Sequence, residues 1–561
     1  MNSLFSQLNL GKRALFAQQS GMSVAGHNIA NVNNENYTRQ RLDLEEQHPR
    51  KSRFGMGVDV QGVSRMTDQF TTKRLIAEHA MQGSLQLREE TYVRLERIFS
   101  EMEGNGLRQS MNEFWNSWAD LSTQPESQVY RQELVSKSRG MTDKFQGISQ
   151  DLIQSRRDLN GRISEKVERV NQLAMQLARQ NEAVQQTDRG EGQANDLKDE
   201  RERTLTELSK LVAIDWVENE NKTIQVQMGG GWQLVNGRKS YKLEASYINE
   251  EAGMFSIRGL DAHGLSTDMT HALRAGEVGE LVRLRDEVVA GYKKKLDTLA
   301  SELAFKVNRL HAVGTGMDSS VQEMHSSFAL KPEAQRMPLP FIKSGRFEAK
   351  LVDNDNHITK VISVNIEAGK DTLADIVAKM NQAAGENPNF SAKLNTDGSV
   401  TLESVKERFI LGDDETEFGA VMGFNNFFET LKGAEDLRVS PRLVEEPLKI
   451  STGKNLIPGD NQVALAVHGL QFEPNMEGDT ITFDEYYNGV LAQLGLETQR
   501  SQNDRKSQDL VVDQFQKIRH QMSSVNMDEE VADMVQYQRG YEAAAKFIST
   551  VDDMTKTVIH M

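Results

Sequence analysis

Residues 4–29 read LFSQLNLGKRALFAQQSGMSVAGHNI, and this stretch decides the fold. Apolar side chains recur along it at alternating spacings of four and three residues, with small or polar residues in the remaining places. Such spacing is typical of the seam of a coiled coil. The large members of the series are Leu4, Leu8, Leu15, Met22 and Ile29.

A second series of mostly small residues keeps the same spacing on another face of this helix. Ordinary core packing explains a single apolar stripe. Two stripes on a terminal helix favour contacts with other chains, because one partner cannot cover both. The second series consists of Leu10, Ala14, Ala17, Gly21 and Val24.

A matching helix is expected at the other end of the chain. It begins at Asn526-Met-Asp-Glu-Glu530, where three carboxylates complement the positive end of the helix dipole. Its seam consists of Met534, Tyr537, Tyr541, Ala544, Ile548, Val551, Thr555 and Val558. Because isolated amphipathic helices are marginal in water, we expect both terminal helices to be largely disordered in the monomer.

We expect the two terminal helices to pair with each other and with neighbouring copies, so that the chain is a self-assembling structural protein. The residues predicted to make inter-subunit contacts are Leu4, Leu8, Leu15, Met22, Ile29, Met534, Tyr537, Tyr541, Ala544, Ile548, Val551 and Val558.

Composition limits the possible functions. A formal net charge of −16 argues against nucleic acid and against acidic membrane surfaces, since both need clustered Lys and Arg. The absence of cysteine excludes disulfides, thiolate nucleophiles and cysteine-based zinc sites. No run approaches the ~20 apolar residues of a membrane span, and no secretory signal opens the chain, so we expect no membrane insertion and export by another route.

Between the two ends, helical and β periodicities alternate, which predicts an α+β multidomain fold with β-rich domains inserted between helices. Helical spacing marks residues 85–102, 107–121, 134–177, 197–211, 281–310 and 511–525, and an alternating pattern marks 214–260 and parts of 318–458. The predicted domains are a terminal coiled coil (1–40 plus 522–561), an elongated helical bundle (41–212 plus 270–317 plus 459–521), a β-rich insertion (213–269) and a β-rich outer domain (318–458).

Searches for catalytic and ligand-binding motifs find none, so no catalytic residue, cofactor or metal is assigned and no enzyme is expected. Asp353 and Asp355 resemble the start of a calcium loop, but Ile358 and Val364 stand where glycine and glutamate are needed, which favours a polar turn. His311 lies near a predicted helix end without ligand partners at metal spacing, which favours a packing or capping role.

Three segments near the N-terminus carry a family resemblance: Arg13-Ala-Leu15, Asn28-Ile-Ala-Asn31 and Tyr37-Thr-Arg39-Gln40. They resemble the signature of bacterial flagellar axial proteins, and within that class the chain is similar to the hook-associated protein 1 family, which forms the hook–filament junction. The signature residues are Asn28, Asn31, Tyr37, Arg39, Gln40, Asn526, Glu529 and Glu530.

Further segments support this family, and the resemblance covers about residues 1–315 and 455–561, leaving the second β region unmatched. The family usually has Thr-Pro-Gly before the tyrosine, where this chain has Asn34-Glu35-Asn36, so we expect asparagine to make the turn. The supporting segments are Asn195-Asp-Leu197, Asp199-Glu-Arg201, Gly276-Glu-Val-Gly279, Arg285-Asp286, Val307-Asn308-Arg-Leu-His311 and Ile548-Ser-Thr550.

The resemblance implies a structural component of the flagellum outside the cell, with terminal helices forming an inner tube. It implies contacts with itself in a ring or helical assembly, with the hook protein and with a second junction protein on the filament side. It also implies export by the flagellar type III apparatus, with a chaperone that covers the C-terminal helix. The predicted chaperone-binding residues are Phe547, Ile548, Val551 and Met554.

Three alternatives stay open at this stage. The chain could be another axial protein, such as hook protein or flagellin. It could also be an axial protein whose outer β domain is a surface adhesin, or one whose outer β domain is an enzyme.

Overall fold

The computed structural model describes residues 2–34, 36–46, 57–100, 106–188, 194–247, 253–261, 263–331, 337, 341–385 and 389–560. The chain divides into two compact units, each assembled from separate stretches of sequence. Unit 1 comprises Met1–Tyr92, Arg157–Arg285 and Gln499–Met561, and unit 2 comprises Val93–Arg156 and Asp286–Thr498. The α+β class and the pairing of the terminal helices are confirmed.

Helices account for most of the regular structure. They are α1 (Asn2–Ala30), α2 (Gln69–Ile98), α3 (Leu107–Thr123), α4 (Gln128–Thr187), α5 (Asn195–Leu211), α6 (Gly276–Arg283), α7 (Ala290–Ala312), α8 (Leu373–Ala384), α9 (Phe418–Met422), α10 (Pro441–Glu445), α11 (Gln462–Gly469), α12 (Phe483–Ser523) and α13 (Met527–His560). A π-helical turn, Leu284–Val289, joins α6 to α7, where the sequence predicts one continuous helix.

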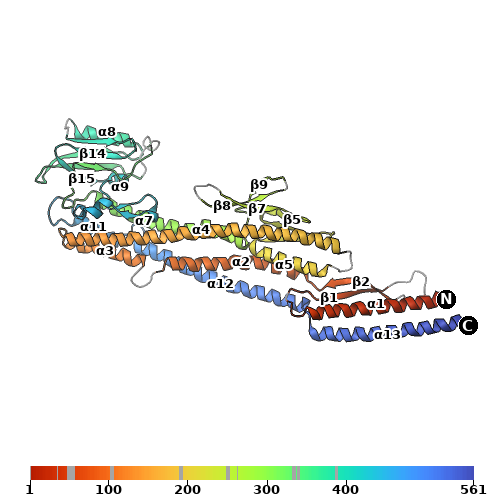
Figure 1. Cartoon of the computed structure of the whole chain (residues 1–561). Helices are drawn as coiled ribbons and strands as arrows, with labels where there is room; N and C mark the ends of the chain where they lie inside the picture. Colours follow the sequence, from red (N-terminus) through yellow and green to blue (C-terminus); the bar gives the residue numbers. More distant parts are fainter. Residues whose placement is uncertain are drawn as a thin grey trace. The chain divides into compact units, whose positions relative to one another are not determined.

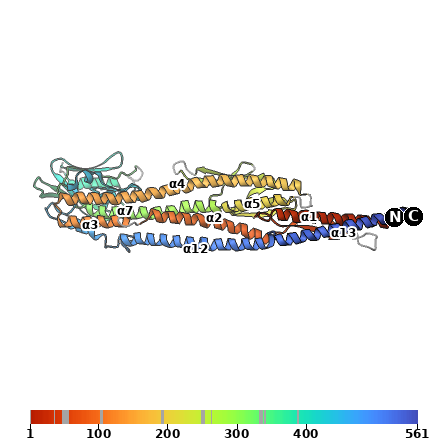
Figure 2. The ribbon, with the colours of Figure 1, turned by 60° about the horizontal axis from the view of Figure 1, so that its bottom comes forward.

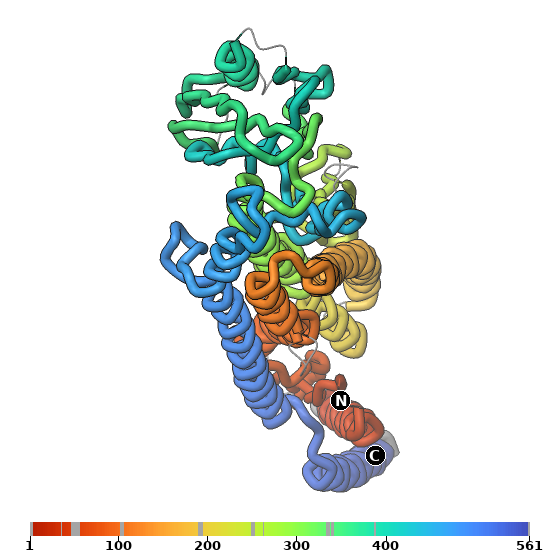
Figure 3. The backbone as a smooth tube through the Cα atoms, turned by 90° about the vertical axis from the view of Figure 1, so that its left-hand side faces the viewer, coloured from red at the N-terminus to blue at the C-terminus, as the bar shows by residue number. Residues whose placement is uncertain are grey.

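In unit 1, α1 and α13 pack along their length as an antiparallel pair, with both chain ends at the same end of the pair (Figures 1 and 3). Glycines set the close approach. A Cβ on Gly11 would lie 2.7 Å from Ile548, one on Gly21 would lie 2.6 Å from the Tyr537 ring, and one on Gly540 would lie 2.6 Å from Gln18. Gly11 and Gln18 continue the first stripe of α1, and Gly21 belongs to the second, so members of both stripes meet α13 in one interface.

A β-hairpin of β1 (Gln40–Glu46) and β2 (Val58–Arg65) lies against another part of α1. Leu10 meets Gly57 at the start of β2, at a distance that leaves no room for a Cβ on the glycine. The hairpin and α13 together cover the small residues of α1 within one chain. The sequence does not show that the chain supplies its own second partner for α1. The expectation that both terminal helices are largely disordered in the monomer stays a prediction, which hydrogen exchange in dilute monomer tests.

The rest of unit 1 consists of helices and two small sheets. Side chains of α2 and α12 interlock where the helices run side by side (Figure 2): Gln508 donates to Glu78 at 2.6 Å, Gln82 donates to Asp509 at 2.9 Å, and Arg505 pairs with Glu89. The sheets have the orders β3-β4-β5-β6 and β7-β8-β9. Their strands are β3 (Ile214–Glu218), β4 (Ile224–Met228), β5 (Trp232–Asn236), β6 (Lys239–Ser240), β7 (Lys242–Tyr247), β8 (Phe255–Leu260) and β9 (Ser266–Asp268).

In unit 2, a fully buried aromatic cluster joins α3 to the segment after α9. Phe114 and Trp118 of α3 lie 6.2 and 5.3 Å, between ring centroids, from Phe427. Asn308 of α7 holds that segment in place, since its side chain donates to the carbonyl of Phe428 and accepts from two backbone N–H groups.

The other part of unit 2 is a β region with one apolar core. Two three-stranded sheets, ordered β12-β11-β15 and β10-β14-β13, share this core with α8. The strands are β10 (Glu323–His325), β11 (Gly345–Val352), β12 (Ile358–Ile366), β13 (Phe390–Leu394), β14 (Val400–Ser404) and β15 (Arg408–Asp414), and a short pair, β16 (Phe428–Glu429) and β17 (Arg438–Val439), follows. The polar turn predicted at Asp353 and Asp355 joins the antiparallel strands β11 and β12, and the turn at 395–398 joins β13 and β14.

His311 is fully buried in unit 2 and acts in packing, as the sequence indicates. Its Nδ1 lies 2.7 Å from the carbonyl oxygen of Asn425, and its Nε2 accepts from the backbone N–H of Ser451 at 3.0 Å. Only the neutral ring, protonated at Nδ1, satisfies both bonds. Burial lowers the pKa of His311 from the ordinary value of 6.5 to about 3.

This pKa predicts acid sensitivity of unit 2. Between pH 6.5 and 3 the unfolded chain binds a proton that the folded chain excludes, so stability falls as pH falls, by about 2 kcal/mol between pH 7 and pH 5. Urea unfolding followed by tryptophan fluorescence measures it. His311→Gln should be less stable at pH 7 but should lose this part of the pH dependence, and an unchanged dependence would contradict the assignment.

Candidate assembly site where the terminal helices meet

The end of α1, the start of β1 and the start of α13 meet in unit 1, and the family-signature residues gather there. Asn28 is 1% exposed, and its amide makes four hydrogen bonds. Its Nδ2 donates to the Gln40 carbonyl and to Glu530, both at 2.9 Å. Its Oδ1 accepts from Tyr37 Oη at 2.7 Å and from the Gln40 N–H at 3.0 Å. Only a side-chain amide, with two N–H donors and an oxygen that accepts two hydrogen bonds, can make these four bonds.

Arg39 links the turn after α1 to α13. Its Nε donates to Glu530 at 2.6 Å, and its Nη1 donates to Glu529 at 2.9 Å. Burial alone would lower the pKa of Arg39, but the two carboxylates raise it above its usual value. Its backbone N–H also donates to the carbonyl of Ser523, at the end of α12. One residue therefore fastens the N-terminal segment to two C-terminal helices.

Tyr37 is fixed as a hydrogen-bond donor. Burial, and then the nearby carboxylates of Asp196, Asp199 and Glu530, raise the pKa of its hydroxyl above the usual range. The hydroxyl therefore stays protonated and donates to Asn28 at any physiological pH. His27 packs edge-on against the Tyr37 ring, with 5.4 Å between centroids.

Asparagines shape the backbone at this site. Asn526 caps α13 by accepting from the N–H of Asp528 at 3.1 Å, and Asn31 donates to the carbonyl of His27 at 3.0 Å. Asn34 Oδ1 accepts from the N–H of Asn36 at 3.2 Å, and its carbonyl accepts from the N–H of Tyr37. Asparagine thus makes the turn that the sequence predicts, although Glu35 lies outside the described residues.

The residues predicted to make inter-subunit contacts lie mainly within the α1–α13 pair of one chain. Ala544 and Val551 are buried, Leu8 and Val558 are 37% and 51% exposed, and the others are half-buried. Their role between subunits stays a prediction. The most exposed apolar side chains of α1 are instead Phe5 and Phe16, at 60% and 59%, which sequence periodicity alone does not single out.

The predicted chaperone-binding residues divide into two kinds. Phe547 and Met554 are 40% and 53% exposed, whereas Val551 is 3% exposed and Ile548 lies over Gly11. A partner that binds all four would have to displace α1.

Sequence reasoning missed that a second family segment completes this site. Asp199 of α5 accepts from both the backbone N–H and the hydroxyl of Thr38, at 3.0 and 2.7 Å, directly beside Arg39. The segment Asp199-Glu-Arg201 stands out in the sequence as a resemblance, but nothing in its spacing says that it meets the turn after α1.

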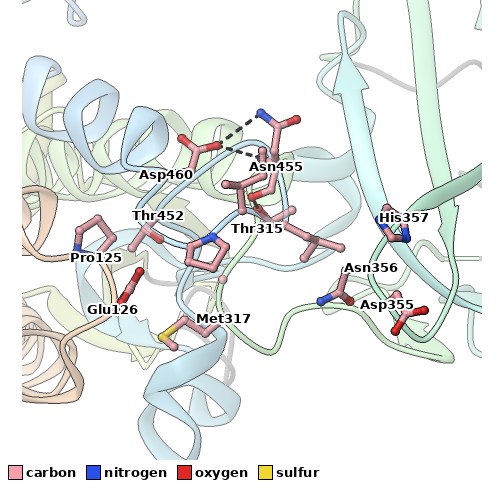
Figure 4. Close-up of a pocket in the computed structure, with 15 residues that line it drawn as sticks. Pro125, Glu126, Thr315, Met317, Asp355, Asn356, His357, Thr452, Asn455 and Asp460 are labelled. Carbon is pink, nitrogen blue, oxygen red and sulfur yellow. Dashed lines mark hydrogen bonds between the residues drawn. The ribbon is translucent and has the colours of Figure 1, made fainter.

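A separate cavity of about 420 Å³ lies in unit 2, next to the turn between β11 and β12 (Figure 4). Asp353, Asp355 and His357 of this turn offer ligand atoms within 4.8 Å of one another. Asp353 Oδ1, however, accepts from the backbone N–H groups of Asp355 and His357, each at 2.9 Å. The bond from His357 also lowers the pKa of Asp353. This geometry supports the polar-turn interpretation.

Two family models match this chain, and both describe flagellar proteins. The family model described as flagellar hook-associated protein FlgK helical domain matches residues 92–324. The model described as flagellar basal body rod FlgEFG protein C-terminal matches residues 521–561. The second match covers the end of α12 and all of α13.

Curated relatives match over their whole length. Flagellar hook-associated protein 1 of Salmonella typhimurium is 24% identical over 562 residues, covering 99% of this chain and 100% of that protein. The protein of the same name from Bacillus subtilis is 24% identical over 571 residues, covering 100% of this chain and 99% of that protein.

Among solved structures, the flagellar hook junction protein FlgK of Burkholderia pseudomallei has a similar fold. The TM-score is 0.52 at 13% identity, and the match covers 80% of this chain and 99% of that one. Within the described ranges, no helix combines the length and apolar character needed to cross a membrane.

Proposed function

The chain belongs to the flagellar hook-associated protein 1 (FlgK) family, and from this premise we propose that it forms part of the junction between hook and filament of a bacterial flagellum. The observation that carries this function is the match to relatives of that name, which covers 99% or more of this chain and of theirs. The family is structural and not enzymatic, and the protein is a flagellar component outside the cell.

The joint between the terminal segments supports a structural role. Asn28, Arg39 and Glu530 fasten α1 to α13 through bonds between residues about five hundred positions apart in sequence. We propose that the four domains expected from the sequence, with their stated boundaries, organise the chain around this joint. Hook protein and flagellin remain rivals within the axial class, and the length of the match favours the junction protein.

Deleting the gene tests the function. A junction protein is needed for filaments to grow on completed hooks, so the deletion should leave hooks without filaments, and the intact gene should restore them. Filaments of normal number in the deletion strain would contradict the proposal.

Most of the β region of unit 2, all but β10, can be excised to separate a structural role from an adhesin or enzyme role. The N–H of Ser327 donates to the carbonyl of Gly423 at 3.2 Å, so excising residues 328–422 joins two neighbouring points of the backbone. Asn425, which holds His311, is kept. A structural junction should still assemble filaments after this excision, while an adhesin or enzyme would lose its separate activity.

We propose that a second copy of this chain packs on the exposed face of α1. Phe5, Leu8, Lys12 and Phe16 form one stripe there, and α1 carries no carboxylate. The outward side of α13 offers the exposed Val531 and Val535, near several carboxylates, and therefore complements α1 in charge and in apolar surface. Two different surfaces in contact give a ring or a helix of copies.

The absence of native cysteine allows a direct test. Chains carrying Phe16→Cys and chains carrying Val535→Cys are assembled together and treated with a short bismaleimide. Crosslinked dimers are expected in the mixture and not with either variant alone. Equal crosslinking of each variant with itself would indicate a two-fold contact and contradict the proposal.

The remaining partners are proposals as well: hook protein, a second junction protein on the filament side, and an export chaperone with the type III apparatus. The chaperone is proposed to bind Phe547, Ile548, Val551 and Met554 after α13 leaves α1. Ile548→Asp with Val551→Asp should weaken chaperone binding, since charges would enter the contact. Calorimetry measures it, with the exposed Ser549→Asp as control, and unchanged affinity would count against this assignment.

A further inference from the structure

One face of α5 carries a row of three carboxylates. Asp196, Asp199 and Glu202 follow one another at intervals of three residues, a spacing that places them on the same side of a helix. They lie in unit 1, next to the joint of the terminal segments, and we call them the acidic row. Together they bind several other segments of the chain.

The middle carboxylate is the most enclosed. Asp199 is 8% exposed, and besides its two bonds from Thr38 it pairs with Arg65 of β2 at 2.8 Å. It therefore ties α5 both to the turn before β1 and to the end of β2. Charge-assisted bonds of this length in a buried place are stronger than ordinary surface ion pairs.

The outer two carboxylates extend the row to further elements. Glu202 pairs with Arg65 at 2.6 Å and with Arg519 of α12 at 3.2 Å. Asp196 accepts from Gln40 Nε2 at 2.9 Å and lies 3.4 Å from His27 Nε2. The acidic row thus reaches α1, the hairpin and α12 at once.

The space beside these bonds is lined mostly by polar residues. Two cavities, of about 280 and 220 Å³, lie beside the row and the turn after α1, and Arg519 and His520 line both of them. The seam between α1 and α13, by contrast, is closely packed around Gly11 and Gly21. The terminal pair is therefore held together by packing, and it is held to α5 by polar bonds.

We propose that Asp196, Asp199 and Glu202 are positioning residues that set the direction in which the α1–α13 pair and its hairpin leave the helices of unit 1. The reasoning rests on the proposed function only in treating this pair as the part that assembles. Removing the charges of the acidic row leaves the α1–α13 pair intact. The angle between this pair and the other helices of unit 1 then becomes variable, because the two cavities beside the row leave space that no packed side chains fill.

Distance measurements between spin labels test this in the full-length chain, which has no cysteine of its own. One label is placed at Ser549→Cys on α13 and the other at Glu168→Cys on α4, both exposed and both in unit 1. In the parent chain we expect a narrow distribution. With Asp199→Asn and Glu202→Gln added, we expect the distribution to broaden.

A second pair of labels, Lys12→Cys with Ser549→Cys, reports on the α1–α13 pair itself and should give the same distance with and without the charges. Glu200→Gln is the matched control, since Glu200 is an exposed carboxylate of the same helix with no ion pair to a described residue. An unchanged distribution in the double variant, equal broadening with Glu200→Gln, or loss of the α1–α13 distance would each overturn the proposal. None of these readouts depends on whether filaments form.

Discussion

Alanine at both Gly11 and Gly21 is expected to open the α1–α13 pair. The added methyl groups would lie 2.7 Å from Ile548 and 2.6 Å from the Tyr537 ring, distances that real Cβ atoms do not reach. Forcing such contacts costs about 1–3 kcal/mol each, against up to ~1 kcal/mol gained by each glycine-to-alanine change within a helix. Hydrogen–deuterium exchange in α1 and α13 should become faster, and filaments should fail to grow on hooks.

The same helix contains the control for this prediction. Gly26 has nothing within 4 Å of the place where a Cβ would stand, so Gly26→Ala keeps the gain in helix propensity and adds no clash. Exchange in α1 should be unchanged or slower in that variant. If both variants behave alike, the packing of α1 on α13 is not what the structure describes. Adding Tyr537→Leu should partly rescue Gly21→Ala, because it removes the ring that the methyl group meets.

Arg131→Met should cost unit 2 at least about 3 kcal/mol, because the buried carbonyl groups that it now binds would lose their donor. The Arg131 side chain is fully buried and forms no ion pair with a carboxylate of the described residues, and burial lowers its pKa to about 10. It donates twice to the carbonyl of Pro125, and to those of Pro447, Leu448 and Ile450, the last at 2.6 Å. Arg131 therefore fixes residues 447–450, which follow the β region in the chain.

Urea unfolding followed by tryptophan fluorescence measures this loss, since Trp115 and Trp118 are buried in unit 2. Arg139→Met is the matched control on the same helix. Arg139 is exposed, and its replacement should change stability by no more than about 0.5 kcal/mol. Arg131→Lys should recover only part of the loss, because an ammonium group has three donors on a single atom and lacks the planar five-donor fork of a guanidinium. Equal stability of the Arg131→Met and Arg139→Met variants would contradict the structural role.

The regular elements were largely predictable from the sequence, because they depend on local patterns. Thr482 and Glu485 form the capping box that their spacing of three residues before a helix indicates, with bonds of 2.8 and 3.1 Å. Helix α4 includes all of residues 134–177. Alpha-helix α2 begins at Gln69, well before the spacing that starts at Leu85. Its first turn lacks a clear apolar stripe, and Phe70 there is 75% exposed.

The candidate site was predictable in its members and not in its contacts. Asn28, Arg39 and Glu530 stand out as signature residues, but their mutual bonds depend on how distant segments fold together. The second stripe of α1 shows the same limit, since periodicity reveals that a face is packed and does not reveal what covers it. Here the hairpin of the same chain covers part of that face.

Cryo-electron microscopy of the hook–filament joint, purified from the source bacterium, tests the central claim most directly. We predict this chain between hook and filament, with α1 and α13 of each copy paired in opposite directions and with Gly21 beside Tyr537. A joint that lacks this chain, or one in which α1 and α13 of the same copy lie apart, would contradict the account.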